Sequence, residues 1–428
     1  MLYFATFVHI KLNTKMKRIF TCCIALVALY TAKAQTPIYD SVSMNPGYAN
    51  AVFYSLANGT LASAPIYAQA DIQIRFENRS ASIRTVDGFG AKVFLPVAHA
   101  LTDWTTLDTT AMIEQINSDT AWENGSFNAT ATGHPSYGWG TYDAVTHDIN
   151  GDKIFVYQNA MGAFKKVQII ILNSLSKTYY IKHANLDGSM EYTDTIGTAD
   201  FPNKNFGYFN FFTRTKIDAE PIGTDWDLVF RKYNRTADNY PVAGVLSNLN
   251  VLTAKLFTHT PNTASGSGLP YYTNMSVIGY DWKIFTPPTG PWAVIDSAAY
   301  FVLDQSNDIW RIVFTGFGGS ATGKAYFTKT KVGSVGINTI PNEAITLATM
   351  YPNPMANDAS ISFTSKNEAE TSIEIYSAQG VLAYSDNITA AAGLNLYQLN
   401  DLGLNNGIYF VHLNQGAETH TFKVIVSK

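Results

Sequence analysis

The chain has 428 residues, of which 46% are hydrophobic and only 14% are charged. This balance excludes an intrinsically disordered chain, and the length allows two or three domains. The first 34 residues hold five of the 29 Lys and Arg residues and none of the 33 Asp and Glu residues, so the rest has a net charge of −9. It has no basic block, so nucleic acid and anionic membranes are not expected as partners. The 25 Tyr and 25 Phe residues favour an all-β fold, because aromatic side chains suit pleated, half-buried surfaces.

The N-terminus has the pattern of a signal peptide. Lys17 and Arg18 supply a positive end, and the apolar run 19–30 follows. We expect translation to start at Met16, with residues 1–15 as an upstream extension. The apolar run is too short to span a bilayer permanently, and no later stretch approaches its length. The sequence therefore predicts an exported protein that has no transmembrane segment and is soluble after cleavage.

The expected cleavage site follows the small residues of Ala32-Lys33-Ala34 and separates Ala34 from Gln35. Cys22 and Cys23 both precede this site, so the mature chain contains no cysteine. Disulfides and thiol chemistry are thereby excluded. Both cysteines lie in the middle of the apolar run, which argues against a lipid-modified N-terminal cysteine.

Most of the mature chain alternates apolar and polar residues between Gly, Asn and Asp turns, which predicts β-strands. The segment Thr110–Asn117 (TAMIEQIN) is the best candidate for a short helix. Residues 333–348 have no strong pattern, and we expect them to form a linker into a separate C-terminal module.

The sequence resembles itself in two places, which indicates an internal duplication. Residues 50–78 align without a gap with residues 206–234. This alignment matches two pairs of residues: Asp71 with Asp227, and Phe53 with Phe209.

A second pair of similar segments follows in the same order. Residues 152–169 align with residues 300–314, and each segment reads as strand, turn, strand. Lys166 then matches Arg311. The spacing predicts two tandem β units, at 35–200 and 201–332.

Two acids, Asp225 and Asp227, bracket Trp226 in the strand-like stretch TDWDLVF. Such carboxylates could be catalytic acids, metal ligands or structural hydrogen-bond acceptors. The matching Asp71 lacks both the tryptophan and the second acid, which favours the structural interpretation. We expect Asp227 to accept backbone N–H groups where a strand begins, and Asp227→Asn to lower stability more than any binding.

Two short motifs resemble known sites but are better explained as turns. Gly318–Lys324 (GGSATGK) has the spacing of a phosphate-binding loop, but Ala325 follows the lysine and a strand follows the loop, where that chemistry needs Ser or Thr and a helix. Asp148–Asp152 (DINGD) resembles the start of a calcium loop, but its glycine comes too early and the twelfth position is Asn159.

No catalytic constellation stands out, so we predict no catalytic residues and no metal site. The sequence has no HExxH, GxSxG or CxxC motif, and its mature histidines do not stand at metal-ligand spacing. His134 and His259 lie in polar or glycine-rich loops, and Met275 follows the second of these loops. Loops with His, Met and aromatic residues could hold a flat apolar cofactor such as haem.

The C-terminal segment contains MYPNP at 350–354, the strand SISF, then IEIYSAQGVLAY, LGLNNGIYFVHLNQG and a terminal FKVIVSK. In these motifs and their order, residues 349–428 resemble the type A sorting domain of the type IX secretion system of Bacteroidetes. The resemblance implies a seven-stranded β-sandwich that the secretion machinery recognises and usually removes, after which the cargo is released or attached to the surface. The residues that carry it are Tyr351, Pro352, Asn353, Pro354, Gly407, Tyr409 and Lys428.

The strands of this module alternate cleanly, with Ile373, Ile375, Val411 and Leu413 expected to face one way. The alternative is an ordinary terminal β-sandwich without an address function.

The central region carries YFNFFTRTKI, TDWDLVFRKYN, YFVLDQSNDIWRIVFTGF and GKAYFTKT, and its first half repeats the pattern loosely. In these elements, residues 47–332 resemble the HmuY-like haemophore family. The resemblance implies a mainly β fold and, in haem-binding members, two axial His or Met ligands on two loops. One ligand of those members lies on the loop before the closing hairpin, where residues 282–290 hold neither His nor Met. His259 and Met275 could substitute from the preceding loop.

Together these observations predict an exported all-β protein with two tandem units, a linker and a sorting domain. The expected function is that of a secreted or surface-attached, non-enzymatic binding protein, delivered by the type IX secretion machinery, with haem or a haemoprotein as a possible partner. The alternative is a structural or adhesive surface protein that contacts glycans or cells.

Overall fold

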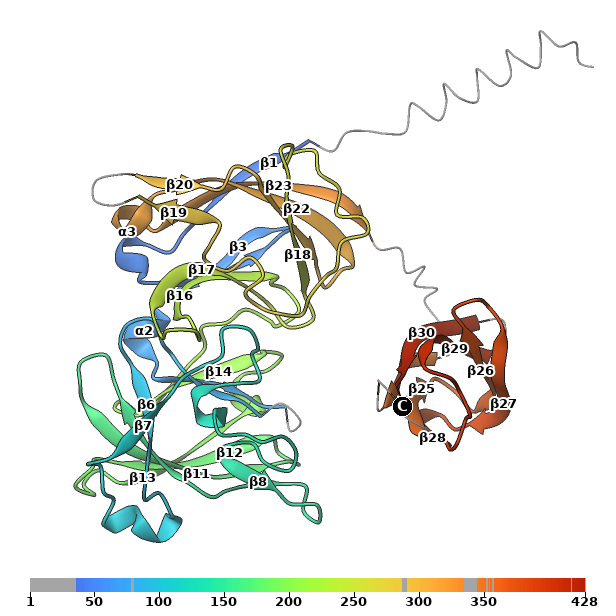
Figure 1. Ribbon diagram of the computed structural model, residues 1–428. Helices are drawn as coiled ribbons and strands as arrows, with labels where there is room; N and C mark the ends of the chain where they lie inside the picture. Colours follow the sequence, from blue (N-terminus) through green and yellow to red (C-terminus); the bar gives the residue numbers. More distant parts are fainter. Residues whose placement is uncertain are drawn as a thin grey trace, which may run out of the picture. The chain divides into compact units, whose positions relative to one another are not determined.

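The computed structural model describes residues 36–77, 81–286, 291–334 and 345–427, apart from positions 352, 354, 356, 357 and 417. The chain divides into two compact units, Met1–Val335 and Gly336–Lys428. The described parts of both units consist of antiparallel strands joined by turns and very short helices (Figure 1). The predicted all-β fold is therefore confirmed.

The first unit contains two lobes, each a sandwich of a larger and a smaller sheet. In the first lobe the larger sheet has the order β13 (Tyr192–Gly197), β12 (Thr178–Ala184), β11 (Phe164–Asn173), β10 (Ile154–Gln158), β6 (Lys92–Pro96) and β7 (Met112–Gln115). Beside it, β9 (Ile149–Gly151) pairs with β11 and with β8 (Gly140–Tyr142). The smaller sheet has the order β15 (Thr215–Ile217), β14 (Phe206–Asn210), β4 (Ile72–Arg75) and β5 (Ile83–Thr85).

The second lobe repeats this plan. Its larger sheet has the order β1 (Ile38–Ser43), β23 (Lys324–Ser334), β22 (Asp308–Phe317), β21 (Ala298–Leu303) and β18 (Leu252–Phe257). The smaller sheet has the order β17 (Pro241–Ser247), β16 (Leu228–Asn234), β2 (Ala51–Ser55) and β3 (Gly59–Ala64). A separate hairpin consists of β19 (Lys283–Phe285) and β20 (Trp292–Val294).

The helices are single turns between strands. They are η1 (Pro46–Tyr48), α2 (Ile66–Gln69), η3 (Leu101–Thr105), η4 (Ser126–Asn128), η5 (Thr198–Asp200) and α3 (Gly319–Thr322). The helix predicted at Thr110–Asn117 is wrong, because β7 occupies this segment and pairs with β6. A helix of eight residues is marginal by itself, whereas this segment gains cross-strand hydrogen bonds along an existing sheet.

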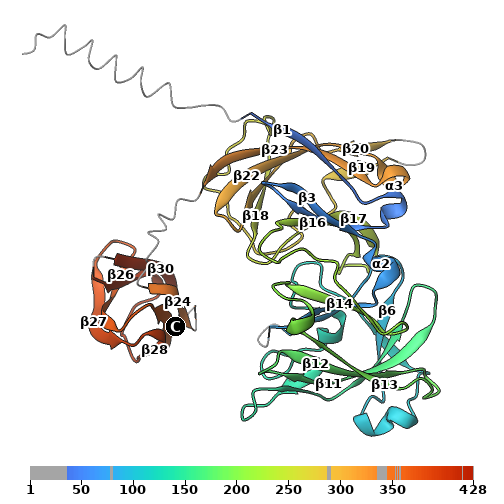
Figure 2. The same cartoon turned by 180° about the vertical axis from the view of Figure 1, so that it is seen from behind.

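The lobes exchange two arms of three strands each. The arm β1–β2–β3 comes first in the chain, yet β1 pairs with β23 and β2 pairs with β16, both in the second lobe. The arm β13–β14–β15 comes later, yet β13 pairs with β12 and β14 pairs with β4, both in the first lobe. Figures 1 and 2 show blue β1 and β3 among the yellow and orange strands of the second lobe.

The two sheet orders correspond strand for strand, as a duplication requires. The order β13-β12-β11-β10-β6 of the first lobe matches β1-β23-β22-β21-β18 of the second. Because the arms are exchanged, each lobe takes strands from both of the predicted ranges 35–200 and 201–332. Those ranges follow the order of the chain, and the lobes in space do not.

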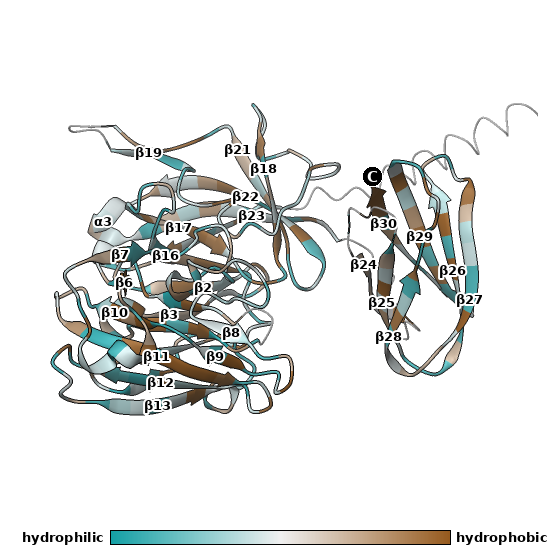
Figure 3. Cartoon of the chain, turned by 60° about the horizontal axis from the view of Figure 1, so that its bottom comes forward, coloured by the Kyte–Doolittle hydropathy of each residue, from teal (hydrophilic) through white to brown (hydrophobic). Residues whose placement is uncertain are grey.

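The three largest hydrophobic clusters of the described first unit form three layers. One lies within the second lobe and includes Tyr54 and Phe230, and another lies within the first lobe and includes Phe155 and Phe209. The third lies between the two smaller sheets, where Trp226 is 1% exposed. Figure 3 shows the underlying pattern, with hydrophobic and hydrophilic residues succeeding one another along the strands.

The second unit is a β-sandwich of seven described strands, as the sorting-domain resemblance implied. One sheet has the order β24 (Ile345–Tyr351), β25 (Ala359–Ser365) and β28 (Gly393–Leu399). The other has the order β27 (Leu382–Ala390), β26 (Ala369–Ser377), β29 (Gly407–Gln415) and β30 (Glu418–Val426). The four residues predicted to face one way are all 0% exposed in its core: Ile373, Ile375, Val411 and Leu413.

The predicted linker at 333–348 overlaps strands at both of its ends. β23 continues to Ser334 and β24 begins at Ile345. Residues 335–344 lie outside the described residues.

The arm exchange predicts which pieces of the chain fold. Residues 38–64 joined to 226–334 by a flexible Gly/Ser linker contain every strand of the second lobe, and we expect a cooperative thermal transition by circular dichroism. The tandem piece 192–334 lacks the arm that pairs with β16 and β23, so we expect no such transition. A sharp transition for 192–334 alone would contradict the exchange.

Candidate functional site

Asp71 and Asp227 occupy equivalent positions at the starts of β4 and β16. The Asp71 carboxylate accepts the backbone N–H of Phe211 at 2.6 Å, and the Asp227 carboxylate accepts that of Leu56 at 2.7 Å. In both cases the N–H donor belongs to the arm that comes from the other copy. The structural role predicted for Asp227 is therefore matched by its contacts, whereas Asp225 is exposed in a turn.

These contacts correct the sequence alignment by one residue. The N–H of Asp71 donates to Phe209 O and that of Asp227 to Tyr54 O, each at 2.9 Å. Tyr54, and not Phe53, is therefore the counterpart of Phe209. The gapless alignment was wrong in its first half because the first copy is one residue shorter than the second between the arm and the aspartate.

An open cleft of about 550 Å³ lies beside Asp71. Four aromatic side chains line it: Tyr67, Phe89, Tyr157 and Phe212. Five alanines leave the space between these rings: Ala68, Ala70, Ala91, Ala160 and Ala163. Mostly apolar walls with a few polar groups are typical of small-molecule sites.

Asp71 is the carboxylate that lines this cleft. Its side chain is 5% exposed, and it accepts the Tyr157 hydroxyl at 2.8 Å in addition to the Phe211 N–H. Burial raises the pKa of Asp71 to about 6, against the lowering effect of these hydrogen bonds. Asp71 thus joins the cleft to the strand pairing of the exchanged arm.

The turn between β10 and β11 forms one wall of the cleft. Asn159 accepts the N–H groups of Met161 at 3.0 Å and of Ala163 at 2.9 Å, and Gly162 has a φ of 84° that favours glycine. The Met161 side chain, which lines the cleft, is left 91% exposed.

The equivalent turn of the second lobe has a larger residue, Gln305, at the position of Ala160. Asp304 accepts the N–H groups of Ser306 and Asp308, in the role of Asn159. Gln305 then corresponds to Ala160, and its amide donates to the carbonyls of Gly223 and Trp226 at 3.1 Å each. The Gln305 side chain thus crosses the space that stays open beside Ala160, and Ala70 likewise stands where the second copy has Trp226.

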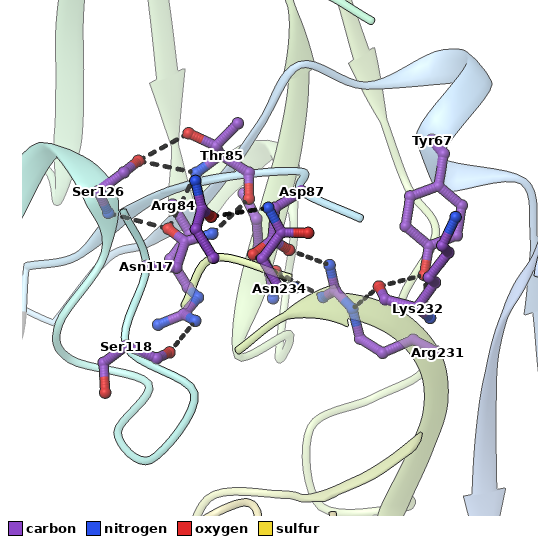
Figure 4. A network of polar contacts seen from close by, with 12 residues as sticks. Tyr67, Arg84, Thr85, Asp87, Asn117, Ser118, Ser126, Arg231, Lys232 and Asn234 are labelled. Atoms are coloured by element: carbon purple, nitrogen blue, oxygen red, sulfur yellow. Dashed lines mark hydrogen bonds and ion pairs between the residues drawn. The ribbon is translucent and has the colours of Figure 1, made fainter. Parts of the chain in front are cut away.

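A buried polar network fixes the wall that carries Tyr67 (Figure 4). The Tyr67 hydroxyl donates to the carbonyl of Lys232 and accepts its N–H, both at 2.7 Å. Arg231 lies 3.6 Å from Asp87 and donates to Gln73 at 3.2 Å. These contacts tie α2 and the β5–β6 loop to β16 of the other lobe.

Gly88 allows the same loop to approach β16 closely. Its φ is +99°, and a Cβ there would come within 3.0 Å of the Lys232 carbonyl group. The next residue, Phe89, packs on Tyr67 with ring centroids 4.5 Å apart. The glycine therefore positions an aromatic wall of the cleft.

His259 and Met275, the residues predicted to contact haem, lie in different surroundings. His259 is exposed in the loop after β18. Met275 is 1% exposed in the hydrophobic layer between the smaller sheets, and its backbone bonds Thr120 and Ser247. Met275 belongs to the core, so a flat cofactor could not reach its sulfur without disrupting that layer, and neither residue is among those that line the cleft.

The two motifs explained as turns are structural. Gly318–Lys324 forms the connection through α3 between β22 and β23. Asp148–Asp152 contains a short strand, β9, which corrects the predicted turn, because Ile149 and Asn150 pair with β11. Asp148 accepts the N–H of Ser174 at 2.7 Å.

In the sorting module, Gly407 begins β29 and the Tyr409 ring is 8% exposed in the core. Asn353 accepts the N–H of Ile425 at 2.9 Å, which attaches the segment after β24 to β30. The remaining predicted positions lie outside the described residues, or for Tyr351 have no described side chain: Ala34, Gln35, Tyr351, Pro352, Pro354 and Lys428.

Comparison with known families identifies the C-terminal module. Residues 349–427 match the family described as a secretion system C-terminal sorting domain. This match indicates export through the periplasm and the outer membrane, to the cell surface or the medium, and an interaction with the type IX secretion machinery. Within the described residues, the search for a helix long and apolar enough to cross a membrane found none.

The remaining comparisons do not bear on the first unit. No curated protein matches the chain. Dimeric latent PorU from Porphyromonas gingivalis is 11% identical over 58% of this chain and 31% of its own, with a TM-score of 0.18. Escherichia coli alpha-2-macroglobulin activated by porcine elastase is 9% identical over 92% of this chain and 44% of its own, with a TM-score of 0.20. The chain spans less than half of either protein, and at these TM-scores neither likeness supports an argument.

Asp227 generates a prediction about stability and pH. Asp227→Ala leaves the Leu56 N–H unsatisfied and should lower the free energy of unfolding by about 1–3 kcal/mol. Asp227→Asn keeps an acceptor and should cost less at pH 7. Urea denaturation of both variants measures the difference.

The pH dependence has a definite sign. Burial raises the pKa of Asp227 from 3.8 to about 6, so the folded protein holds this proton more tightly than the unfolded chain. The contribution of Asp227 to stability is then full below about pH 4 and is lost as the pH rises through 6. Relative to Asp227→Asn, the native protein should gain on the order of 1–3 kcal/mol between pH 7 and pH 4. A pH-independent difference would contradict the buried carboxylate.

The sorting module generates a second prediction. Deletion of residues 349–428 should leave the protein in the periplasm, because the secretion machinery no longer recognises it. Cell fractionation measures the location, and a mature N-terminus at Gln35 would show that the first export step is intact. Surface delivery of the truncated protein would refute the address function.

Proposed function

We propose that the first unit is a non-enzymatic binding module that holds a small apolar molecule in the cleft beside Asp71. The observation that carries this proposal is the difference between the two copies. At equivalent positions the second lobe has Gln305, whose amide crosses to two carbonyls, and the first lobe has Ala160, beside which the cleft is open. A duplicated fold that opens in one copy supports a dedicated site.

The polar groups of the cleft support binding rather than catalysis. Asp71 already accepts a hydrogen bond on each carboxylate oxygen, from Tyr157 and from Phe211. No histidine, serine or cysteine stands among the residues that line the cleft. A general base or nucleophile needs a free side chain within reach of the reacting atom.

Haem, which the HmuY-like resemblance suggests, is the first natural ligand to test. The cleft offers aromatic walls and the Met161 thioether, but its lining residues include no histidine and no second methionine. The residues present therefore do not form the pair of His or Met axial ligands that the resemblance implies. Haem would bind here as a flat apolar body, and we derive no step through its iron.

Ala160→Gln tests the proposed site, because it installs the side chain that crosses the equivalent space of the second lobe. We expect the full chain to bind the neutral fluorophore N-phenyl-1-naphthylamine, and Ala160→Gln to weaken this binding at least about tenfold. The control is Ala321→Gln, an exposed change on α3, which should bind normally. Equal binding by all three proteins would place the probe elsewhere and refute the proposal.

Haemin titration tests whether haem binds in the cleft or at His259. A shift of the Soret band that Ala160→Gln abolishes and His259→Ala preserves would place haem in the cleft. A shift that only His259→Ala abolishes would support the ligand predicted from the sequence.

An adhesive role is the second candidate, and it rests on exposed aromatic rings outside the cleft. Tyr39, Tyr240 and Tyr272 are 81%, 59% and 52% exposed. Such rings can stack on sugars. Retention of the protein on immobilised polysaccharide, lost in the triple Tyr→Ala variant and kept in Ala160→Gln, would favour adhesion over small-molecule binding.

A further inference from the structure

Lysines beside aromatic rings recur in the first unit, and most of them are paired. Seven lysine ammonium groups lie within 6.0 Å of a ring centroid. Lys182, Lys255 and Lys329 pair with the carboxylates of Glu191, Asp281 and Asp40. Lys166 and Lys283 donate to backbone carbonyls.

The two exceptions both adjoin the cleft. The Lys232 ammonium lies 4.2 Å from the centroid of Phe89, and the Lys165 ammonium lies 5.3 Å from that of Phe212. Both rings line the cleft. Within the described chain, neither ammonium group has an oxygen partner at hydrogen-bond or ion-pair distance.

The surroundings of the two lysines differ in charge. Burial alone lowers the pKa of Lys232, and no neighbouring charge opposes it. Burial also lowers the pKa of Lys165, but Asp71 and Asp187 attract its charge from beyond ion-pair distance. Of the two lysines, Lys232 is therefore the one whose partly buried charge an added anion would stabilise more.

We propose that the cleft takes an amphiphilic anion, with an apolar body between the aromatic walls and a carboxylate, sulfonate or phosphate group at Lys232. This inference rests on the proposed function and adds the chemical class of the ligand. Lys165 contributes a second, weaker attraction. The apolar body covers Asp71, whose oxygens already accept hydrogen bonds, while the acid group stays on the Phe89 side, where Lys232 lies.

Two fluorescent probes with the same apolar body test the charge separately from the shape. 8-Anilinonaphthalene-1-sulfonate differs from N-phenyl-1-naphthylamine by its sulfonate group. We expect the full chain to bind the sulfonate probe at least about tenfold more tightly than the neutral probe, because a partly desolvated charge pair adds to the same apolar burial. Added salt should reduce this advantage.

Lys232→Met removes the charge and keeps an unbranched apolar stem of similar length. This variant should weaken the sulfonate probe about five- to tenfold and leave the neutral probe within about twofold, which also shows that the cleft is still folded. The control Lys255→Met removes another lysine that lies over aromatic rings, in the second lobe, and should change neither probe.

The results distinguish a failure of anion recognition from a failure of the cleft as a binding site. Neutral binding that Ala160→Gln abolishes, together with no preference for the sulfonate or no effect of Lys232→Met, would overturn the anion inference and leave the proposed function standing. If neither probe binds the native protein, the proposed function itself fails.

Discussion

Strand pairing between distant parts of the chain is the constraint on which the first unit depends. β2 pairs with β16 and β4 pairs with β14, so neither smaller sheet can form from one copy of the duplicated sequence. The two aspartates strengthen these joints. Each buried carboxylate accepts an N–H from the exchanged arm, and an unsatisfied N–H in that place would be costly. The hydrophobic layer between the smaller sheets then unites the two lobes.

The cleft follows from the freedom that duplication gives to one copy. Both copies keep the turn residue that accepts two N–H groups, Asn159 in one and Asp304 in the other. Both also keep a buried cation on the second strand of the hairpin, since Lys166 donates to Trp104 O and Arg311 to Ala264 O. What changes is the residue after the turn acceptor, Ala160 against Gln305, together with Ala70 against Trp226. The framework is therefore conserved between the lobes, and the difference lies in a loop, where recognition is commonly placed.

The sequence was sufficient for the class of fold, the repeated segments and the sorting module. Alternation has a period of two in strands, so it predicted the core positions Ile373 and Val411, both 0% exposed. The exchange of arms could not be predicted, because strand alternation says which face is buried and not which strand is the partner. The helix expected at Thr110–Asn117 failed for a related reason, since only the position of β6 decides the structure of that segment.

The site was harder to predict than the fold. His259 and Met275 were predicted as haem ligands from their residue types. In the structure His259 is exposed in a loop and Met275 is in the core. The informative signal was instead a small residue in one copy at a position where the other copy has a large residue. Ala160 and Gln305 are such a pair. The sequence could not predict that the Lys232 side chain lacks an acidic partner, because this depends on which acids the folded chain places beside it.

The pairing of β1 with β23 joins Ile38 to Lys329 across almost the whole first unit. β1, the first described strand, therefore has no partner until β23 has been made. Contacts so far apart in the chain form slowly, because the intervening loop must close first. The second lobe can therefore close only after the chain has been made through Ser334, the end of β23. A closed second lobe consequently shows that the chain is present from β1 through β23. In the sequence, β23 lies shortly before residue 349, where the sorting domain that directs outer-membrane export begins.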